Sequence, residues 1–216
     1  MPPALAGQLD QMMAWLEACG VATLCEDGIE ADDRIASLTL QASAASLRVV
    51  IASSDKDFMQ LVGPLVGLFN PNEATGAVCT APDVRAKTGV EPEQIVDWLS
   101  LTGDQVDNIP GVPGIGPKTA TALLRRFATC DRLFAELAQV EPERLRVSLR
   151  SCAETVRRNQ QMIRLKADLP ETLALERLRP GAEDTARLRE LYARWGFKSL
   201  LAALERRPSA QGLLFS

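Results

Sequence analysis

The sequence contains no histidine among its 216 residues. Mechanisms that need an imidazole base or ligand are therefore excluded, including the Ser–His–Asp and Cys–His arrangements and histidine-ligated zinc. The five cysteines are scattered and form no CxxC pair, which argues against a disulfide framework and against a cysteine zinc site. We therefore expect any bound metal to be held by oxygen ligands, which suit Mg²⁺, Mn²⁺ or Ca²⁺.

Long apolar runs are also lacking. No stretch approaches the length of a transmembrane helix, and the N-terminus has neither the charged nor the apolar region of a signal peptide. Aromatic residues make up 5% of the chain and apolar residues 46%, which is typical of an ordinary α-rich or α/β protein. Together with the scattered cysteines, these absences predict a cytoplasmic protein.

The net charge of −4 conceals a strong asymmetry. Residues 1–117 carry 5 Lys/Arg and 16 Asp/Glu, a net charge of −11, whereas residues 118–216 carry 19 and 12, a net charge of +7. Such a division indicates an acidic part that binds cations, followed by a basic part that meets a polyanion.

Apolar periodicity predicts an α/β protein whose second half is helical. Strands are expected at 21–25, at 49–52 (covered on both faces) and at 65–69. One helix is expected before Gly20, and a second begins at Glu30 and buries Ile35 and Leu38. Later helices are expected at 92–101, at 118–127, as one long helix with a core stripe over 145–156, and around 188–195 and 200–204, with Gly196 as a cap between the last two.

Two acidic segments are candidates for chemistry. "EADD" places Glu30, Asp32 and Asp33 at the start of a predicted helix, where the plain interpretation is a solvated first turn. "DKD" places Asp55 and Asp57 just after a predicted strand, at the edge where open α/β sheets bind ligands. Residues i and i+2 of an extended stretch point the same way, so both carboxylates can face one cation. The plain interpretation of this segment is a polar loop.

"GDQVDNIPGVPGIGPKTA" is the most specific stretch, because two acids precede a Gly/Pro-rich hairpin that leads directly into a helix. Backbone N–H groups of such a turn, with the helix N-terminus behind it, form a phosphate site that ignores base identity. Glycine permits positive φ and close approach there, and Ile115 can anchor the turn in the core. The residues expected to bind nucleic acid are Gly111, Gly114, Ile115, Gly116, Lys118 and Thr119.

The segments "GIEADDRIASL", "IASSDKDFMQLV" and "LTGDQVDNIPGVPGIGPKTATALL", with "RWGFKSLLAAL" near the end, occur in an order and spacing that resembles the 5′-nuclease domain of bacterial DNA polymerase I and the wider flap-endonuclease and 5′-3′ exonuclease superfamily. The resemblance covers nearly the whole chain. It implies a PIN-like or Rossmann-like nuclease core at 1–103, a helix-hairpin-helix region at 104–208 and a tail at 209–216.

This resemblance also implies a site and a reaction. The family holds two divalent metals, Mg²⁺ or Mn²⁺, which activate a water and stabilise the leaving oxygen in phosphodiester hydrolysis. The implied metal ligands are Glu30, Asp32, Asp33, Asp55, Asp57, Asp104 and Asp107, of which the first five are also the implied catalytic residues. The hairpin at 111–119 is implied to grip duplex DNA behind the scissile bond, with a K⁺ on its backbone carbonyls. We expect a monomer that acts on DNA 5′ ends, nicks and flaps at the nucleoid, in replication and repair.

The sequence departs from the family at its start. Family members begin with an Asp-bearing strand, followed by a second Asp and a basic helical arch, all upstream of the segment that matches Met1. The resemblance therefore implies an N-terminally truncated core with impaired cleavage. The alternative is a non-catalytic helix-hairpin-helix protein that binds branched or nicked DNA. A Mg²⁺ phosphatase is a weaker alternative, since a DxD after a strand is similar to haloacid-dehalogenase phosphatases, but their following Thr or Val is missing.

The final segment "QGLLFS" resembles the Q-x-x-L-F peptides that dock bacterial replication proteins on the sliding clamp. Gln211 would be the polar anchor, and Leu214 and Phe215 would fill an apolar pocket. The competing interpretation is a tail that covers an apolar patch of its own domain.

Overall fold

The computed structural model describes residues 3–169 and 174–206. The chain divides into two compact units: a central unit, Gly28–Thr172, and a terminal unit that combines Met1–Asp27 with Leu173–Ser216. Among the helices of the described residues, none combines the length and the apolar character needed to cross a membrane.

The central unit contains a mixed three-stranded sheet of order β1-β2-β3. β1 (Val49–Ala52) pairs in parallel with β2 (Val66–Phe69), which pairs antiparallel with β3 (Val78–Cys79). The α/β prediction and the strands expected at 49–52 and 65–69 are confirmed. β3 was not anticipated, because two residues are too short to show an alternating pattern.

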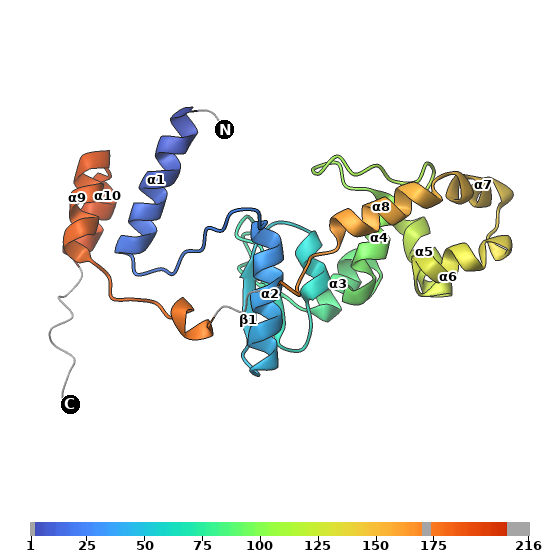
Figure 1. The fold of residues 1–216 in the computed structure, drawn as a ribbon, viewed down its shortest axis with the longest axis horizontal. Coiled ribbons are helices and arrows are strands. Elements are labelled where there is room, and N and C mark those ends of the chain that lie inside the picture. The colour runs from blue at the N-terminus through green and yellow to red at the C-terminus, as the bar shows by residue number, and fades with distance from the viewer. Residues whose placement is uncertain (1–2, 170–173, 207–216) are drawn as a thin grey trace. The chain divides into compact units, whose positions relative to one another are not determined.

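The expectation that β1 is covered on both faces is wrong. Ile51 is buried, but Val50 is 58% exposed. β-branched residues favour the extended backbone whether or not both faces are covered, so the apolar run indicated a strand and not its degree of burial. One covering helix is α2 (Ala31–Ala44), which packs against β1 (Figure 1).

α2 buries different residues from those expected. Its fully buried positions are Arg34, Ala36, Ser37 and Thr39. Ile35 and Leu38 are only partly buried, although Ile35 contacts the main apolar core. The buried face of this helix is therefore mostly small or polar, which apolar periodicity cannot reveal.

The rest of the central unit is helical. Between and after the strands lie η1 (Asp57–Leu61), α3 (Ala81–Thr88), η2 (Pro92–Gln94), α4 (Ile95–Thr102), α5 (Pro117–Phe127), α6 (Cys130–Ala135), η3 (Leu137–Gln139), α7 (Glu143–Ser151) and α8 (Ala153–Ile163). α4 packs against both α5 and α8 (Figure 1). The fully buried Asn159 of α8 donates to the carbonyls of Ser100 (3.1 Å) and Pro110 (2.8 Å), and so joins α8 to the segment that leads into the hairpin.

The long helix expected over 145–156 is in fact two helices, α7 and α8, that break at Cys152. The N–H of Cys152 is shared between the carbonyls of Ser148 and Leu149, at 3.1 Å each. Leu149 and Val156 are both fully buried. The apolar stripe therefore marked core residues correctly, but two helices that meet at an angle can present the same stripe as one straight helix.

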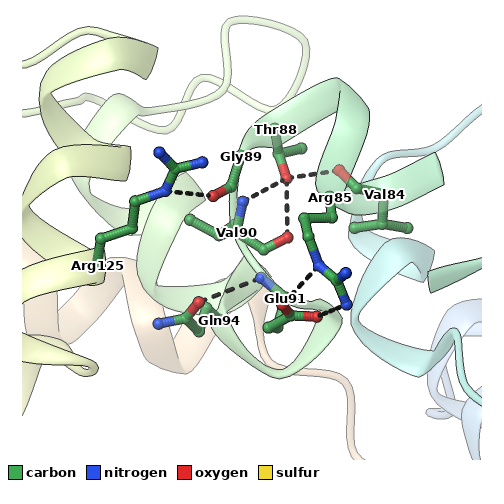
Figure 2. Close-up of polar contacts among 8 residues, drawn as sticks. All are labelled: Val84, Arg85, Thr88, Gly89, Val90, Glu91, Gln94 and Arg125. Carbon is green, nitrogen blue, oxygen red and sulfur yellow. Dashed lines mark hydrogen bonds and ion pairs between the residues drawn. The ribbon is translucent and has the colours of Figure 1, made fainter. Parts of the chain in front are cut away.

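A polar corner joins α3 to the helices that follow (Figure 2). α3 ends at Gly89, whose φ of +80° favours glycine, and the Gly89 carbonyl accepts from Nε of Arg125 on α5 at 3.2 Å. The Arg85 guanidinium pairs with the Glu91 carboxylate at 2.6 Å, and the Glu91 N–H donates to Oε1 of Gln94 at 3.1 Å. The bond from Arg125 ties α5, the helix after the hairpin, to the end of α3, and the other two contacts fix the turn that follows α3.

The terminal unit is a small helical assembly of α1 (Pro3–Ala18), η4 (Leu175–Leu178), α9 (Thr185–Trp195) and α10 (Lys198–Glu205). Its core includes Ala18, Leu188 and Leu191, and Nε1 of Trp15 donates to the Tyr192 hydroxyl at 3.0 Å. The helices expected before Gly20 and around 188–195 and 200–204 are confirmed. Gly196 caps α9 with a φ of +72°.

The prediction of a strand at 21–25 is wrong. These residues form no regular element, and Val21 is 48% and Leu24 38% exposed. A short apolar run becomes a strand only where a neighbouring strand pairs with it, and none of the described strands does so here.

Candidate metal centre

Three carboxylates converge beyond the carboxyl end of β1. Asp55, Asp57 and Asp107 each offer an oxygen, and these oxygens lie within 4.8 Å of one another. Asp55 follows the strand and its Oδ1 accepts the N–H of Asp57 at 2.9 Å, which turns the chain into η1. This local bond keeps both carboxylates at the strand end, where parallel sheets present their ligands.

Asp107 reaches this point from a different part of the chain, on the tight loop 104–109. Asp104 and Ile109 exchange two backbone hydrogen bonds of 3.0 and 2.8 Å, and Asn108 adopts a φ of +55° that asparagine tolerates better than most residues. Asp107 is therefore exposed at the loop tip, close to the carboxylates after β1.

The N-terminus of α2 brings the acids of "EADD" to the same place. Glu30 is the N-cap residue of α2, and Asp32 and Asp33 lie in its first turn. A pocket of about 440 Å³ is lined by six of the seven predicted carboxylates, namely Glu30, Asp32, Asp33, Asp55, Asp57 and Asp107. The first turn of α2 therefore faces a shared acidic pocket, which a merely solvated helix start does not explain.

Asp104 occupies a separate position. It is 6% exposed, and its Oδ2 pairs with Nζ of Lys56 at 3.0 Å while its Oδ1 accepts the N–H of Val106 at 2.9 Å. Burial raises the pKa of Asp104, but these hydrogen bonds and the Lys56 charge outweigh it, so that the pKa lies below its ordinary value. Asp104 is thus an ionised, internally paired acid beside the pocket.

The pocket carboxylates are mutually repulsive. Burial raises the pKa of Asp57 to about 7, with further increases from the charges of Asp55, Asp107, Asp104 and Asp32. Burial and neighbouring carboxylates, Asp55 first among them, also raise the pKa values of Asp32 and Asp107. Without a cation, therefore, the folded state holds a cluster that favours bound protons.

The residues present fit a hard divalent cation. Oδ1 of Asp57 is buried and has no hydrogen-bond partner, and such an atom costs free energy unless something compensates it. The pocket offers carboxylate oxygens from three separate elements, which is the donor set that Mg²⁺ and Mn²⁺ prefer. An ion bound there would satisfy Asp57 and offset the repulsion.

The hairpin after α4 is held by a close backbone approach. Gly103 has a φ of +78°, and a Cβ on it would lie 2.4 Å from the Gly111 nitrogen. Ile115 is 5% exposed, as expected for an anchor in the core. Gly114 uses a positive φ of +83°, whereas Gly116 has a φ of −98° and serves as the N-cap of α5.

The remaining hairpin residues lie at the start of α5. Lys118 is exposed and Thr119 is half-buried in its first turn. The helix-hairpin-helix expected from the sequence is therefore present as α4, the Gly/Pro-rich turn and α5, and the N-terminus of α5 carries an exposed cation.

One wall of the acidic pocket has no counterpart in the sequence-based expectations. The segment 163–166, called here the basic segment, begins at the last residue of α8, and its residues Arg164, Leu165 and Lys166 line the same pocket as the acids. The Lys166 N–H donates to Oδ1 of Asp33 at 2.8 Å. No local pattern could have identified this wall, because the contact spans more than a hundred residues of sequence.

Comparison with solved structures assigns the fold to a nuclease class. A variant of the flap endonuclease of bacteriophage T5, solved as a pseudo-enzyme-product complex with DNA and metal ions, matches 86% of this chain and 63% of its own with a TM-score of 0.61 and 21% sequence identity. At that identity the likeness establishes the fold. The three-stranded sheet and the helices that follow it thus share the fold of that flap endonuclease.

Sequence comparison identifies the family. Residues 1–89 match the model of the 5′-3′ exonuclease N-terminal resolvase-like domain, and residues 90–186 match that of the 5′-3′ exonuclease C-terminal SAM fold. The 5′-3′ exonuclease of Aquifex aeolicus is 33% identical over 216 residues, covering 99% of this chain and 73% of the relative. DNA polymerase I of Bacillus caldotenax is 34% identical over 206 residues, covering 94% and 24%. The chain belongs to the 5′-3′ exonuclease family, and it spans about a quarter of the polymerase relative.

Proposed function

We propose that this chain hydrolyses phosphodiester bonds of DNA at 5′ ends or 5′ flaps, with Mg²⁺ or Mn²⁺ held by the acidic pocket. The observation that carries the proposal is the convergence of Asp55, Asp57 and Asp107 with the first turn of α2 in one pocket. The relatives named 5′-3′ exonuclease support the same reaction.

The position of each pocket residue suggests its role. Asp55, Asp57 and Asp107 would hold the cation nearest β1, and Glu30 and Asp32 face the same pocket from α2. When bound, divalent metals supply an activated water and neutralise the charge that develops on the phosphate. Asp104 keeps Lys56 beside the site, and Asp33 fixes the basic segment through the Lys166 N–H.

Single-turnover cleavage of a 5′-labelled flap DNA tests this function. The wild-type chain is expected to release the flap in Mg²⁺ and not in EDTA, and Asp57→Asn is expected to slow release by at least about a hundredfold, because a cation ligand is lost. Glu93→Gln, which alters an exposed acid outside the pocket, is the matched control. A chain that binds the flap but never cuts it would instead support the non-catalytic DNA-binding alternative.

The hairpin at 111–119 is the proposed duplex-binding element. Its turn and the N-terminus of α5 offer backbone N–H groups, and Lys118 adds an exposed charge beside them. These groups contact phosphates rather than bases, so binding is expected to be indifferent to base sequence.

Lys118→Ala is expected to weaken binding of all duplex sequences alike and to lower the salt slope by about one. Fluorescence anisotropy with two duplexes of unrelated sequence, each titrated from low to high KCl, measures both quantities. A loss confined to one of the two sequences would show that the hairpin reads bases.

The C-terminal residues Gln211, Leu214 and Phe215 lie outside the described residues, and the proposal that they bind a sliding clamp rests on their sequence. Two apolar anchors in a groove contribute a few kcal/mol, roughly enough for micromolar affinity. In a pull-down, the full chain is expected to retain the bacterial sliding clamp and Leu214→Ala/Phe215→Ala to lose it. Equal retention by both, or by neither, would reject the motif.

A further inference from the structure

The acidic pocket has a cationic wall that none of the acidic motifs accounts for. Of its lining residues, which all lie in the described part of the chain, Arg164 and Lys166 are the cations, and both belong to the basic segment 163–166. Both side chains are exposed, and that of Lys166 is 74% so. Its Nζ lies 4.0 Å from Oδ2 of Asp33, a partnership loose enough for the ammonium to contact an incoming anion as well.

The basic segment is built into the site through Gln60 of η1. The Gln60 side-chain amide donates to the carbonyls of Asp57 and Ile163, both at 2.9 Å, and its Oε1 accepts the Leu165 N–H at 3.2 Å. One side chain therefore bonds the backbone of a pocket carboxylate and the backbone on either side of Arg164. With the bond from Lys166 N–H to Asp33, the segment is fixed to both acidic elements.

The basic segment also separates two pockets. Arg164, Leu165 and Lys166 line a second pocket of about 540 Å³, which Arg157 of α8 lines as well. A strand that passed from the acidic pocket into the second one would meet Arg164 and Lys166 and then Arg157. Arg157 pairs with the exposed Glu154, while Asp131 and Asp168 also line the second pocket. Phosphates are anions, and a cluster of carboxylates repels them unless cations lie close by.

We propose that Arg164 and Lys166 bind the substrate phosphates that flank the phosphodiester at the acidic pocket, and that Gln60 is the positioning residue that holds their segment. This inference rests on the proposed nuclease function, since it needs a nucleic acid strand at the pocket. It adds two phosphate-binding residues and the structural reason for their position.

Equilibrium binding of a labelled 5′-flap DNA in EDTA, titrated with KCl, tests the proposal without metal or cleavage. Arg164→Ala/Lys166→Ala is expected to bind roughly tenfold more weakly at moderate salt and to lower the salt slope by about two. The matched control is Arg48→Ala/Lys87→Ala, which also removes one exposed Arg and one exposed Lys, neither of which lines the acidic pocket, and is expected to keep the wild-type slope. Arg164→Lys/Lys166→Arg, which retains both charges, is expected to restore it.

Gln60→Leu separates positioning from charge, because both cations remain in the chain. Its salt slope is expected to fall toward that of the double alanine variant, a change that loss of stability alone does not produce in the folded fraction. Should this variant fail to fold, Gln60→Asn keeps an uncharged amide but shortens it by one methylene, and an intermediate slope is expected.

A wild-type slope for Arg164→Ala/Lys166→Ala would overturn the proposal, and a wild-type slope for the folded Gln60 variant would overturn the positioning role. Both results are independent of catalysis. A chain that binds flap DNA through Arg164 and Lys166 but does not cut it would refute the nuclease function and leave this inference standing. A chain that cuts normally and binds flap DNA with the wild-type slope without those cations would refute this inference and leave the nuclease function standing.

Discussion

Replacing Asp55 and Asp57 by asparagine is expected to abolish the heat released when Mn²⁺ is titrated into the protein. The two carboxylates, with Asp107, place their oxygens within 4.8 Å of one another, and an amide oxygen carries no charge to hold a divalent ion. Isothermal titration calorimetry of wild type and of Asp55→Asn/Asp57→Asn measures the difference.

Metal binding should also increase the free energy of unfolding. Mn²⁺ at about a hundred times its dissociation constant is expected to stabilise the wild type by roughly 2.7 kcal/mol and the double variant by nothing. Glu73→Gln/Glu93→Gln, which neutralises two acids outside the pocket, is the control and should behave as wild type. Equal heats from wild type and the Asp55/Asp57 variant would place the metal elsewhere.

The metal-free protein is expected to lose stability as the pH rises from about 4 to about 7. Burial and neighbouring carboxylates raise the pKa of Asp57 in the folded state to about 7, against an ordinary value of 3.8. Between those values the folded state keeps a proton that the unfolded state has released, so raising the pH favours unfolding. The raised pKa values of Asp32 and Asp107 act in the same direction.

Asp57→Asn should remove most of this dependence. At pH 8 in EDTA the variant is expected to be more stable than wild type by about 1–2 kcal/mol, a figure reduced for the partial exposure of the pocket. Near pH 4 the two should nearly converge, because Asp57 is then protonated in the folded state and only about half ionised in the unfolded state, so that little of the pKa difference is expressed. Urea unfolding of both proteins at both pH values measures this difference in the free energy of unfolding. A wild-type stability that rises with pH across this range would contradict the raised pKa.

The predictions on metal binding and on pH follow from one property of the acidic pocket. The carboxylates that suit a divalent cation destabilise the fold when no cation is bound. Oδ1 of Asp57 is buried without a partner and the pKa of this carboxyl is raised to about 7, so replacing Asp57 is expected to weaken metal binding and to stabilise the metal-free protein.

Several parts of this protein followed from local sequence alone. The strands at 49–52 and 65–69, the hairpin anchored by Ile115, and the cap at Gly196 depend on residues near in the chain, whose backbone preferences act in any context. The acids at the end of β1 and at the start of α2 were found for the same reason, since each group lies at the boundary of an element that its own residues define.

Other parts were decided only by the tertiary structure. The break at Cys152, the exposure of Val50 and the absence of a strand at 21–25 depend on which neighbours are present, and apolar periodicity does not contain that information. The raised pKa of Asp57 likewise depends first on burial, which the fold decides, and the charge of Asp107, fifty residues away, adds to it.

The sequence by itself determined which side chains can do chemistry: acids and no histidine, hence oxygen ligands for a hard cation, followed by a phosphate-binding hairpin. Only the tertiary structure decided which of them meet. It brought Asp107 to Asp55 and Asp57, paired Asp104 with Lys56, and placed Arg164 and Lys166 in the lining of the same pocket, where Gln60 holds their segment. These contacts join residues that are about fifty to more than a hundred positions apart, and they form only when burial of the shared core outweighs the entropy of closing such loops.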